Sequence, residues 1–123
     1  MPQTIVEYSN NLIEKGAIDP NALAVDVNKT LAALQTFGDA DLKCIVRGSD
    51  LYARSSAQPE NKAFLWVVVN ILGGRPLELR QQISKDIIAM LKTKIKLVDG
   101  LEIQISVDVN EMNKDTYIKE ILN

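Results

Sequence analysis

The run AFLWVVVNIL, residues 63–72, constrains the fold of this chain more than any other segment. It is almost continuously apolar and rich in β-branched and aromatic side chains, which is typical of a central strand covered on both faces. The run is interrupted at Asn70 and is far too short to span a bilayer. We therefore expect residues 63–72 to form the centre of a sheet in an α/β protein.

The residues after this run complete a strand–helix–strand unit. Gly73-Gly74 breaks the strand, and Arg75-Pro76 opens a helix. A turn at Asp99-Gly100 then leads to residues 101–109, where apolar and polar residues alternate strictly, as in a half-buried strand. Between them, apolar residues at three- and four-residue steps predict about four helical turns; these are Leu79, Ile83, Ile87, Ile88, Leu91 and Ile95.

The first half of the chain has the same order of elements. Residues 4–8 (TIVEY) predict a strand, and the polar residues 9–18 predict a connection. Asp19 followed by Pro20 predicts a helix start, because Asp caps a helix and Pro is preorganised for its first position. We expect this helix to end at Gly38, with an apolar face formed by Leu23, Val27, Leu31 and Leu34.

Residues 42–52 predict the second strand of this first unit. Its side chains should point alternately to two sides, with Leu42, Cys44 and Val46 on one side and Lys43, Ile45 and Arg47 on the other. The polar residues 54–62, which include Pro59, predict a loop to the central strand.

Together these elements predict a single domain over residues 1–123, of the α/β (α+β) class. It consists of two β-α-β units, residues 2–53 and 63–109, and a tail, residues 110–123, whose end predicts a short helix. Each unit should hold parallel strands joined by a right-handed crossover, and the two units should form one four-stranded sheet. Two helices cover only one face of such a sheet, so we expect a homo-oligomer to bury the other face.

The composition excludes several kinds of site. The chain has no histidine, which removes Ser–His and Cys–His nucleophile pairs and most zinc sites. An acid or base must then be a carboxylate, Lys, Tyr, Cys or the terminal amine. The formal net charge of -2 provides no basic field for nucleic acid and no polybasic membrane anchor. One cysteine, Cys44, and an N-terminus without a secretory signal favour the cytoplasm.

Three segments together resemble one known family. MPQTIVEYSNNL, VNKTLAAL and above all ILGGRPLELRQQ are similar to the 5-carboxymethyl-2-hydroxymuconate isomerases of the tautomerase superfamily, in the same order from Pro2 to about Val109. The resemblance implies a β-α-β repeat that assembles as a homotrimer. It also implies an amino-terminal proline, freed by removal of Met1, that acts as the catalytic base on a small anionic enol or dienol. No metal or organic cofactor is implied.

Pro2 is the candidate catalytic residue. Once Met1 is removed, the Pro2 nitrogen is a secondary amine, whereas before removal it is an amide and cannot act as a base. An α-amino group has an ordinary pKa of about 7.7–8.0, and burial and nearby cations lower it toward neutrality, where a general base is most effective. The alternative is that proline is merely tolerated at the start of a strand.

Arg75 is the first candidate for substrate binding. A cation at a helix N-terminus opposes the helix dipole by roughly 0.3–1 kcal/mol, so this position is unusual for arginine. Gly73-Gly74 allows close approach, free N–H groups favour an anion, and arginine can hold a carboxylate through two hydrogen bonds. The resemblance implies that Arg75 is the substrate-binding arginine of the family. The alternative is a solvated side chain that leans away from the helix.

Lys43 and Arg47 are further candidates for substrate binding. Four residues apart on one strand, they share a face and lie roughly 13 Å apart, so they could hold opposite ends of a dicarboxylate. The family has an arginine near the position of Lys43, but lysine offers a point charge rather than a fork. The alternative for both residues is an ordinary surface charge.

The remaining polar and aromatic residues are expected to be structural. Arg80 should lie on the solvated face or in a salt bridge, and Cys44 should be a small core residue. Phe64 and Trp66 should serve the core or a subunit contact. No catalytic role is assigned to Tyr8, Glu7, Glu102 or Asp108, since the three carboxylates have no evident partner.

The sequence favours an enzyme, a cofactor-free tautomerase that moves a proton in an acid such as 5-carboxymethyl-2-hydroxymuconate. One alternative is a tautomerase homologue with another substrate, such as phenylpyruvate. A second alternative, from a different class, is a non-catalytic oligomeric binding module with the same fold. The mass of the intact chain distinguishes a free Pro2 nitrogen from one blocked by Met1.

Overall fold

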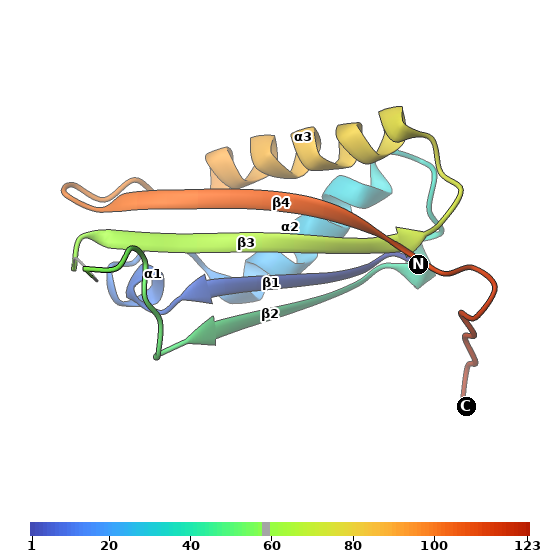
Figure 1. Cartoon of the computed structure of the whole chain (residues 1–123), viewed down its shortest axis with the longest axis horizontal. Helices are drawn as coiled ribbons and strands as arrows, with labels where there is room; N and C mark the ends of the chain where they lie inside the picture. Colours follow the sequence, from blue (N-terminus) through green and yellow to red (C-terminus); the bar gives the residue numbers. More distant parts are fainter. Residues whose placement is uncertain (58–59) are drawn as a thin grey trace.

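The computed structural model describes residues 1–57 and 60–123, so the predicted loop over residues 54–62 lies partly outside the described residues. The chain forms one four-stranded sheet with two long helices, α2 and α3, on one face (Figure 1). The strands are β1 (Gln3–Ser9), β2 (Lys43–Ser49), β3 (Lys62–Leu72) and β4 (Glu102–Met112). The helices are α1 (Asn11–Glu14), α2 (Pro20–Ala32) and α3 (Leu77–Lys94), with a short 3-10 turn, η1 (Asp39–Asp41), before β2.

The strand order β2-β1-β3-β4 confirms the predicted tandem β-α-β repeat. β1 and β2 are parallel, β3 and β4 are parallel, and the two units meet where β1 and β3 run antiparallel. Parallel neighbours need a crossover, which α2 supplies in the first unit and α3 in the second. Because the first strands of the two units are antiparallel, β1 and β3 begin at opposite ends of the sheet.

Helix α2 begins where the sequence predicts and ends earlier. The Asp19 carboxylate caps it by accepting hydrogen bonds from the backbone N–H groups of Asn21 and Ala22, at 3.1 and 3.4 Å. The predicted end at Gly38 is wrong, since α2 stops at Ala32. Gln35 already has a φ of 57°, in the left-handed region that terminates a helix.

The core lies between the helices and the sheet and follows the predicted apolar faces. Leu23, Val27 and Leu31 of α2 and Ile83, Ile87 and Leu91 of α3 are buried against the inward residues of β1 and β3. The two edge strands add alternate residues, among them Cys44 and Val46 of β2 and Ile103 and Ile105 of β4. The predicted sides of the 42–52 and 101–109 segments are therefore confirmed.

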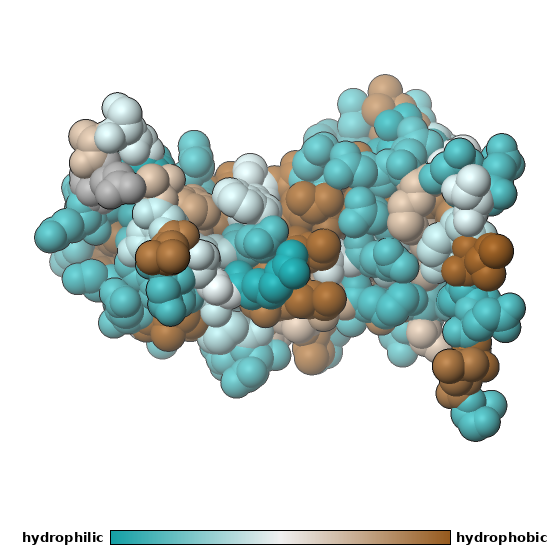
Figure 2. Space-filling model, turned by 60° about the horizontal axis from the view of Figure 1, so that its bottom comes forward, coloured by the Kyte–Doolittle hydropathy of each residue, from teal (hydrophilic) through white to brown (hydrophobic). Residues whose placement is uncertain are grey.

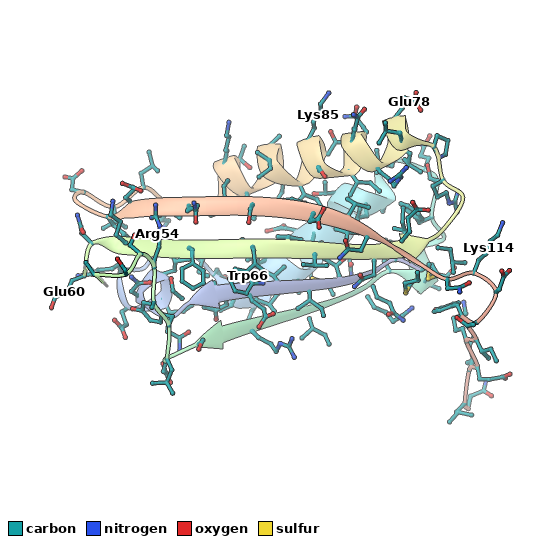
Figure 3. The ribbon with its side chains drawn as sticks, viewed as in Figure 1. Arg54, Glu60, Trp66, Glu78, Lys85 and Lys114 are labelled. Carbon is teal, nitrogen blue, oxygen red and sulfur yellow. The ribbon has the colours of Figure 1, made fainter. Side chains whose placement is uncertain are left out.

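The other face of the sheet is open in the single chain. β3 was expected to be covered on both faces, but its burial alternates, and Trp66 is 42% exposed. Ile45 on the neighbouring β2 is 56% exposed. Figure 3 shows Trp66 near the middle of the sheet, and Figure 2 shows hydrophobic side chains near the middle of the molecule and at the projecting C-terminal segment. This uncovered apolar surface explains why the sequence pattern of β3 is that of a doubly covered strand.

The strand ends differ from the prediction for reasons of pairing. β2 stops at Ser49 rather than residue 52, because β1, the strand paired with it, ends at the paired residue Ser9. β4 continues beyond residue 109 to Met112, because β3 still offers Leu72 as a partner there.

Two further local predictions are corrected. Residues 9–18 hold the short helix α1 rather than a plain connection. The tail forms a turn near Asn113 and no helix, because Ile118, Ile121 and Leu122 remain exposed and give a short helix nothing to pack against. Among the described residues, no helix has the length and apolar character needed to cross a membrane.

Candidate functional site

Pro2 lies at the start of β1, at the end of the sheet where β3 and β4 finish (Figure 1). Its side chain is fully buried, and its carbonyl oxygen accepts a hydrogen bond from the backbone N–H of Lys43 at 3.3 Å. The Met1 amine lies beside it and donates to the carbonyl oxygen of Asp41 at 3.0 Å. The amino terminus is therefore held at one end of the strands of a packed sheet.

Lys43 is placed beside the amino terminus by the parallel pairing of β1 and β2. Gln3 pairs with Lys43 in the strand register, so the lysine lies next to the first residues of β1. Its ammonium group is exposed and donates to the Asp41 carbonyl oxygen at 2.9 Å. Within residues 1–57 and 60–123, no carboxylate lies in ion-pair contact with Lys43.

The environment of the amino terminus favours a neutral amine. The pKa of the Met1 amine is lowered from its ordinary value of 8.0, first by burial and next by the positive charge of Lys43. The negative charge of Asp41 acts in the opposite direction, and Lys119 from the tail adds a further lowering. Removal of Met1 would make the Pro2 nitrogen the terminal amine, in a residue whose carbonyl oxygen is bound by the backbone N–H of Lys43.

Arg75 lies in the loop from β3 to α3, at the same end of the sheet as Pro2, because β3 ends where β1 begins. The loop is fixed to β4: the Gly73 N–H donates to the Met112 carbonyl oxygen at 3.0 Å. The exposed Arg75 guanidinium stacks over the Phe37 ring, with 5.4 Å from its carbon to the ring centre. It leans toward the end of α2 and is available at the surface.

The backbone N–H of Gly74 in this loop already has a partner. It donates to the Glu111 carboxylate at 3.1 Å, whereas no side chain caps the start of α3 at Pro76. Gly74 has a φ of 98°, a conformation that favours glycine. Glu111 also forms a salt bridge with Arg80 at 3.4 Å, which confirms one of the two roles expected of Arg80. An incoming anion would therefore meet the Arg75 side chain rather than the N–H of Gly74.

Arg47 lies apart from these residues within the single chain. It shares the open face of β2 with Lys43, but it pairs in register with Glu7 and forms a salt bridge with the Glu7 carboxylate at 3.7 Å. The expectation that Glu7 has no partner is therefore wrong. Arg47 and Glu7 border an open hollow of about 320 Å³ that includes Phe64 and Trp66, whose rings stack at 5.3 Å.

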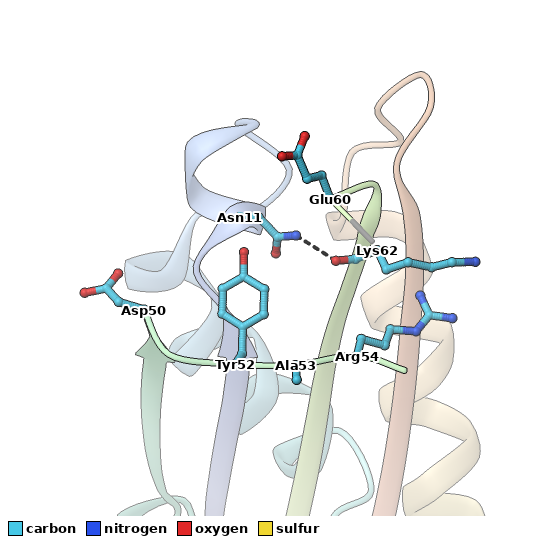
Figure 4. A pocket seen from close by; sticks show the side chains of 7 residues that line it. All are labelled: Asn11, Asp50, Tyr52, Ala53, Arg54, Glu60 and Lys62. Carbon is cyan, nitrogen blue, oxygen red and sulfur yellow. Dashed lines mark hydrogen bonds between the residues drawn. The ribbon is translucent and has the colours of Figure 1, made fainter. Parts of the chain in front are cut away.

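A second polar hollow, of about 220 Å³, lies at the opposite end of the sheet from Pro2 (Figures 3 and 4). Figure 4 shows Arg54 and Lys62 extending over β4. Both pair there with the Glu102 carboxylate, at 2.8 Å for Lys62, so the expectation that Glu102 has no partner is also wrong. Asn11 donates to the Lys62 carbonyl oxygen at 2.8 Å. The cations of this hollow already have carboxylate partners.

The remaining candidates are structural. Tyr8 is buried in the core. Cys44 packs against the core, and burial raises the pKa of the Cys44 thiol to about 11. Asp108 accepts a hydrogen bond from the Val109 N–H at 2.9 Å. In the part of the chain that the structure describes, no three His, Cys, Asp or Glu side chains gather as a metal site requires.

Sequence reasoning missed three contributors to the Pro2 end. Phe37 supports Arg75, Asp41 lies against the amino terminus, and Lys119 pairs with the Asp41 carboxylate. They come from a turn and a tail without periodic pattern, so no local signal in the sequence joins them to Pro2.

A family model described as 5-carboxymethyl-2-hydroxymuconate isomerase matches residues 2–121. Comparison with curated protein sequences found no match. A solved 5-carboxymethyl-2-hydroxymuconate isomerase from Deinococcus radiodurans R1 is 20% identical, with a TM-score of 0.81 over 97% of this chain and 88% of that chain. A solved 5-carboxymethyl-2-hydroxymuconate delta-isomerase is 14% identical, with a TM-score of 0.73 over 100% of this chain and 89% of that chain.

A third solved structure, the Q0 fused 4-OT wild type symmetric trimer, is 15% identical, with a TM-score of 0.68 over 92% of this chain and 87% of that chain. At these identities, the likeness of the three solved structures shows a shared fold.

Proposed function

The chain belongs to the 5-carboxymethyl-2-hydroxymuconate isomerase family, and on that premise we propose that it is a cofactor-free tautomerase with the free nitrogen of Pro2 as general base. Its substrate would be a small unsaturated 2-hydroxy acid or diacid, such as 5-carboxymethyl-2-hydroxymuconate. Family membership supports the broad class of isomerase or tautomerase, and the residues around Pro2 support the mechanism.

The proposed step moves one proton and leaves the atoms of the substrate otherwise unchanged. The Pro2 nitrogen takes the proton of the 2-hydroxyl group, whose electron pair forms the ketone while the conjugated double bonds shift by one position. The protonated nitrogen then returns the proton to the carbon at the end of the conjugated system. One group acts first as base and then as acid, so neither a metal nor a second reactant is consumed.

Two cations support binding of an acidic substrate at this end of the sheet. Lys43 lies beside the amino terminus with no carboxylate in ion-pair contact among the described residues. Arg75 presents an exposed guanidinium from the β3–α3 loop. We assign them the substrate carboxylates and the negative charge that develops on the oxygen. Arg47 stays a prediction, since within one chain it is paired with Glu7.

A homotrimer accords with the open apolar face of the sheet. Trp66 and Ile45 would be buried there by neighbouring copies, which restores the cover that the pattern of β3 predicts. The solved structures of similar fold include a fused 4-OT symmetric trimer. We therefore propose assembly of three copies through this face.

The observation that carries the proposal is the position of Pro2, buried at the head of β1 with the backbone of Lys43 bound to its carbonyl oxygen. The test is a panel of enol acids, including 5-carboxymethyl-2-hydroxymuconate and phenylpyruvate, followed by ultraviolet absorbance with protein whose mass lacks Met1. Turnover of one acid with kcat/KM well above the others identifies the substrate. No turnover of any of them would favour a non-catalytic binding module.

The Pro2→Ala variant tests the base. It leaves a primary amine of similar basicity without the rigid ring, so we expect a partial loss of kcat. Pro20→Ala is the matched control, because Pro20 begins α2 far along the chain and should leave kcat unchanged. Full turnover by Pro2→Ala would contradict the assignment.

A further inference from the structure

β4 ends at Met112 near the amino terminus, and the C-terminal segment then projects from this end of the sheet (Figure 1). A turn at Asn113 redirects the chain, with the N–H of Tyr117 bound to the Asn113 carbonyl oxygen at 3.1 Å. Six residues beyond the turn, the Lys119 ammonium group pairs with the Asp41 carboxylate, 78 residues away in the sequence. This contact joins the end of the chain to the beginning of β2.

Asp41 occupies a special position at this end of the sheet. Its backbone carbonyl oxygen accepts hydrogen bonds from the Met1 amine at 3.0 Å and from the Lys43 ammonium group at 2.9 Å. The charged groups that shift the pKa of the Met1 amine are the Asp41 carboxylate on η1, Lys43 on β2 and Lys119 on the tail. An unpartnered carboxylate here would attract a protonated amine and would hold the proton on it.

Resting on the proposed function, we propose that Lys119 is a positioning residue for the Pro2 base. By holding the Asp41 carboxylate, Lys119 prevents this anion from forming an ion pair with the protonated imino group of Pro2. The nitrogen then loses its proton at neutral pH and can accept the one from the substrate. Lys119 touches neither substrate nor reacting atoms, and it acts through Asp41.

The charges at this end agree with that role. Hydrogen bonding and charge from Lys119 hold the pKa of the Asp41 carboxyl below its ordinary value of 3.8, so Asp41 is ionised at every pH where the amine could act as a base. Asp41 raises the pKa of the Met1 amine, and Lys119 lowers it. The two opposing charges lie within one ion pair, so loss of the lysine leaves the carboxylate uncompensated.

The experiment measures the pKa of the Pro2 imino group directly, by NMR titration of protein labelled with [15N]proline and freed of Met1. We compare wild type with Lys119→Ala, Asp41→Asn and the double variant. We expect Lys119→Ala to raise the pKa of the Pro2 imino group by about 0.5–1 unit, because the Asp41 carboxylate would then act on this group at a distance shorter than the Debye length. Asp41→Asn should not raise the pKa of Pro2. In the double variant, Lys119→Ala should raise this pKa by less than half of the amount seen when Lys119→Ala is the only change.

The pH profile of kcat/KM gives the matching functional measurement. In Lys119→Ala, the acidic limb should move upward by the same amount, so kcat/KM falls by about three- to tenfold below the pKa. The plateau at high pH should not change. Lys114→Ala, on the same segment, is the matched control with no shift, and Lys119→Arg should restore the wild-type profile.

The outcomes separate this inference from the proposed function. If wild type turns over an enol acid but Lys119→Ala leaves the Pro2 pKa unchanged, or Lys114→Ala shifts it equally, Lys119 has no positioning role. If no enol acid is turned over, the proposed function fails, while the NMR titration still decides whether Lys119 compensates Asp41. A uniform loss of kcat/KM at all pH values would mean that Lys119 only anchors the tail, and this would overturn the inference.

Discussion

The two ends of the sheet are equivalent positions of the internal repeat, yet the residue that begins the second strand of each unit carries the opposite charge at the two ends. At the first end, Gln3 of β1 pairs in register with Lys43 of β2. At the second end, Lys62 of β3 pairs in register with Glu102 of β4. The start of β2 thus carries a cation where the start of β4 carries a carboxylate.

This difference shows why a hollow lined by cations need not be a binding site. At the second end, Glu102 neutralises both Lys62 and Arg54, so the charges serve to join the chain to itself. At the first end, Lys43 donates only to a backbone oxygen among the described residues, and its charge remains available to a substrate. The repeat also cannot copy the base, because the nitrogen at the head of β3 belongs to a peptide bond.

The largest expected effect comes from turning the Pro2 nitrogen at the first end into an amide, like the backbone nitrogen at the head of β3. Protein that retains Met1 has an amide at Pro2, as at the head of β3, and should lose the contribution of a general base, about 10²–10⁴-fold in rate. The measurement is kcat/KM on preparations whose mass shows Met1 present or absent. Removal of Met1 from the unfolded blocked protein with an aminopeptidase, followed by refolding, should restore activity. Equal activity of the two preparations would rule out Pro2 as the base.

The second prediction compares the loss of one arginine at each end of the sheet. Arg75→Ala removes a charged hydrogen-bond donor worth about 1.5–3 kcal/mol to a bound carboxylate, so kcat/KM should fall about 10- to 100-fold. Tm should change little, because Arg75 is exposed.

Arg54→Ala is the matched variant at the other end and should behave in the opposite way. Arg54 is only 16% exposed and donates to the carbonyl oxygens of Ala63 and Glu102, so its loss should lower Tm without changing kcat/KM. A loss of activity in Arg54→Ala larger than in Arg75→Ala would place the site at the wrong end of the sheet.

The third prediction concerns a variant that gives the start of β2 the same negative charge as the start of β4. Lys43→Glu puts a carboxylate beside the amino terminus, which raises the pKa of the amine and repels an acidic substrate, so we expect kcat/KM to fall about tenfold at neutral pH. Lys43→Arg keeps the charge and should retain most of the activity. If Lys43→Glu is fully active, the charge at this position does not matter.

The smallest expected effect concerns stability at the second end. Lys62 and Arg54 hold the pKa of Glu102 below its ordinary value of 4.5, so the ion pairs stabilise the fold above about that pH and lose this effect as pH falls through the lowered value. Wild type and Glu102→Gln should therefore differ slightly in Tm at pH 7 and should converge at acidic pH, once the pH is below the lowered pKa of Glu102. A difference that stays constant with pH would mean that the Glu102 charge contributes nothing.

Periodicity predicted most of the fold because its signal comes from the core. The alternation over residues 101–109 and the helical spacing through Ile83, Ile87 and Leu91 reflect burial against the same sheet, and the structure confirms both. The predicted end of α2 at Gly38 and the predicted short helix in the tail are wrong. The end of α2 depends on the left-handed conformation of Gln35, and the tail lacks a surface to pack against. The spacing of apolar residues along the sequence predicts neither feature.

The candidate site was predictable only in part, because its residues come from separate elements. The order of strands brings the predicted Lys43 and the loop of Arg75 to the end where Pro2 lies, and this follows from the repeat. The Glu111 carboxylate on Gly74 and the Lys119 pair with Asp41 could not be foreseen. Each joins residues far apart in the sequence, and their side chains meet only after the sheet has formed.

The burial of Pro2 also has a consequence for the biosynthesis of the protein. A peptidase needs the Met1–Pro2 bond in an accessible, extended form, but the folded chain buries the proline and ties the Met1 amine to Asp41. On the proposed mechanism, methionine excision therefore competes with the closing of β1 against its neighbours. The fraction of chains able to catalyse would be set during translation, by which of these two events comes first.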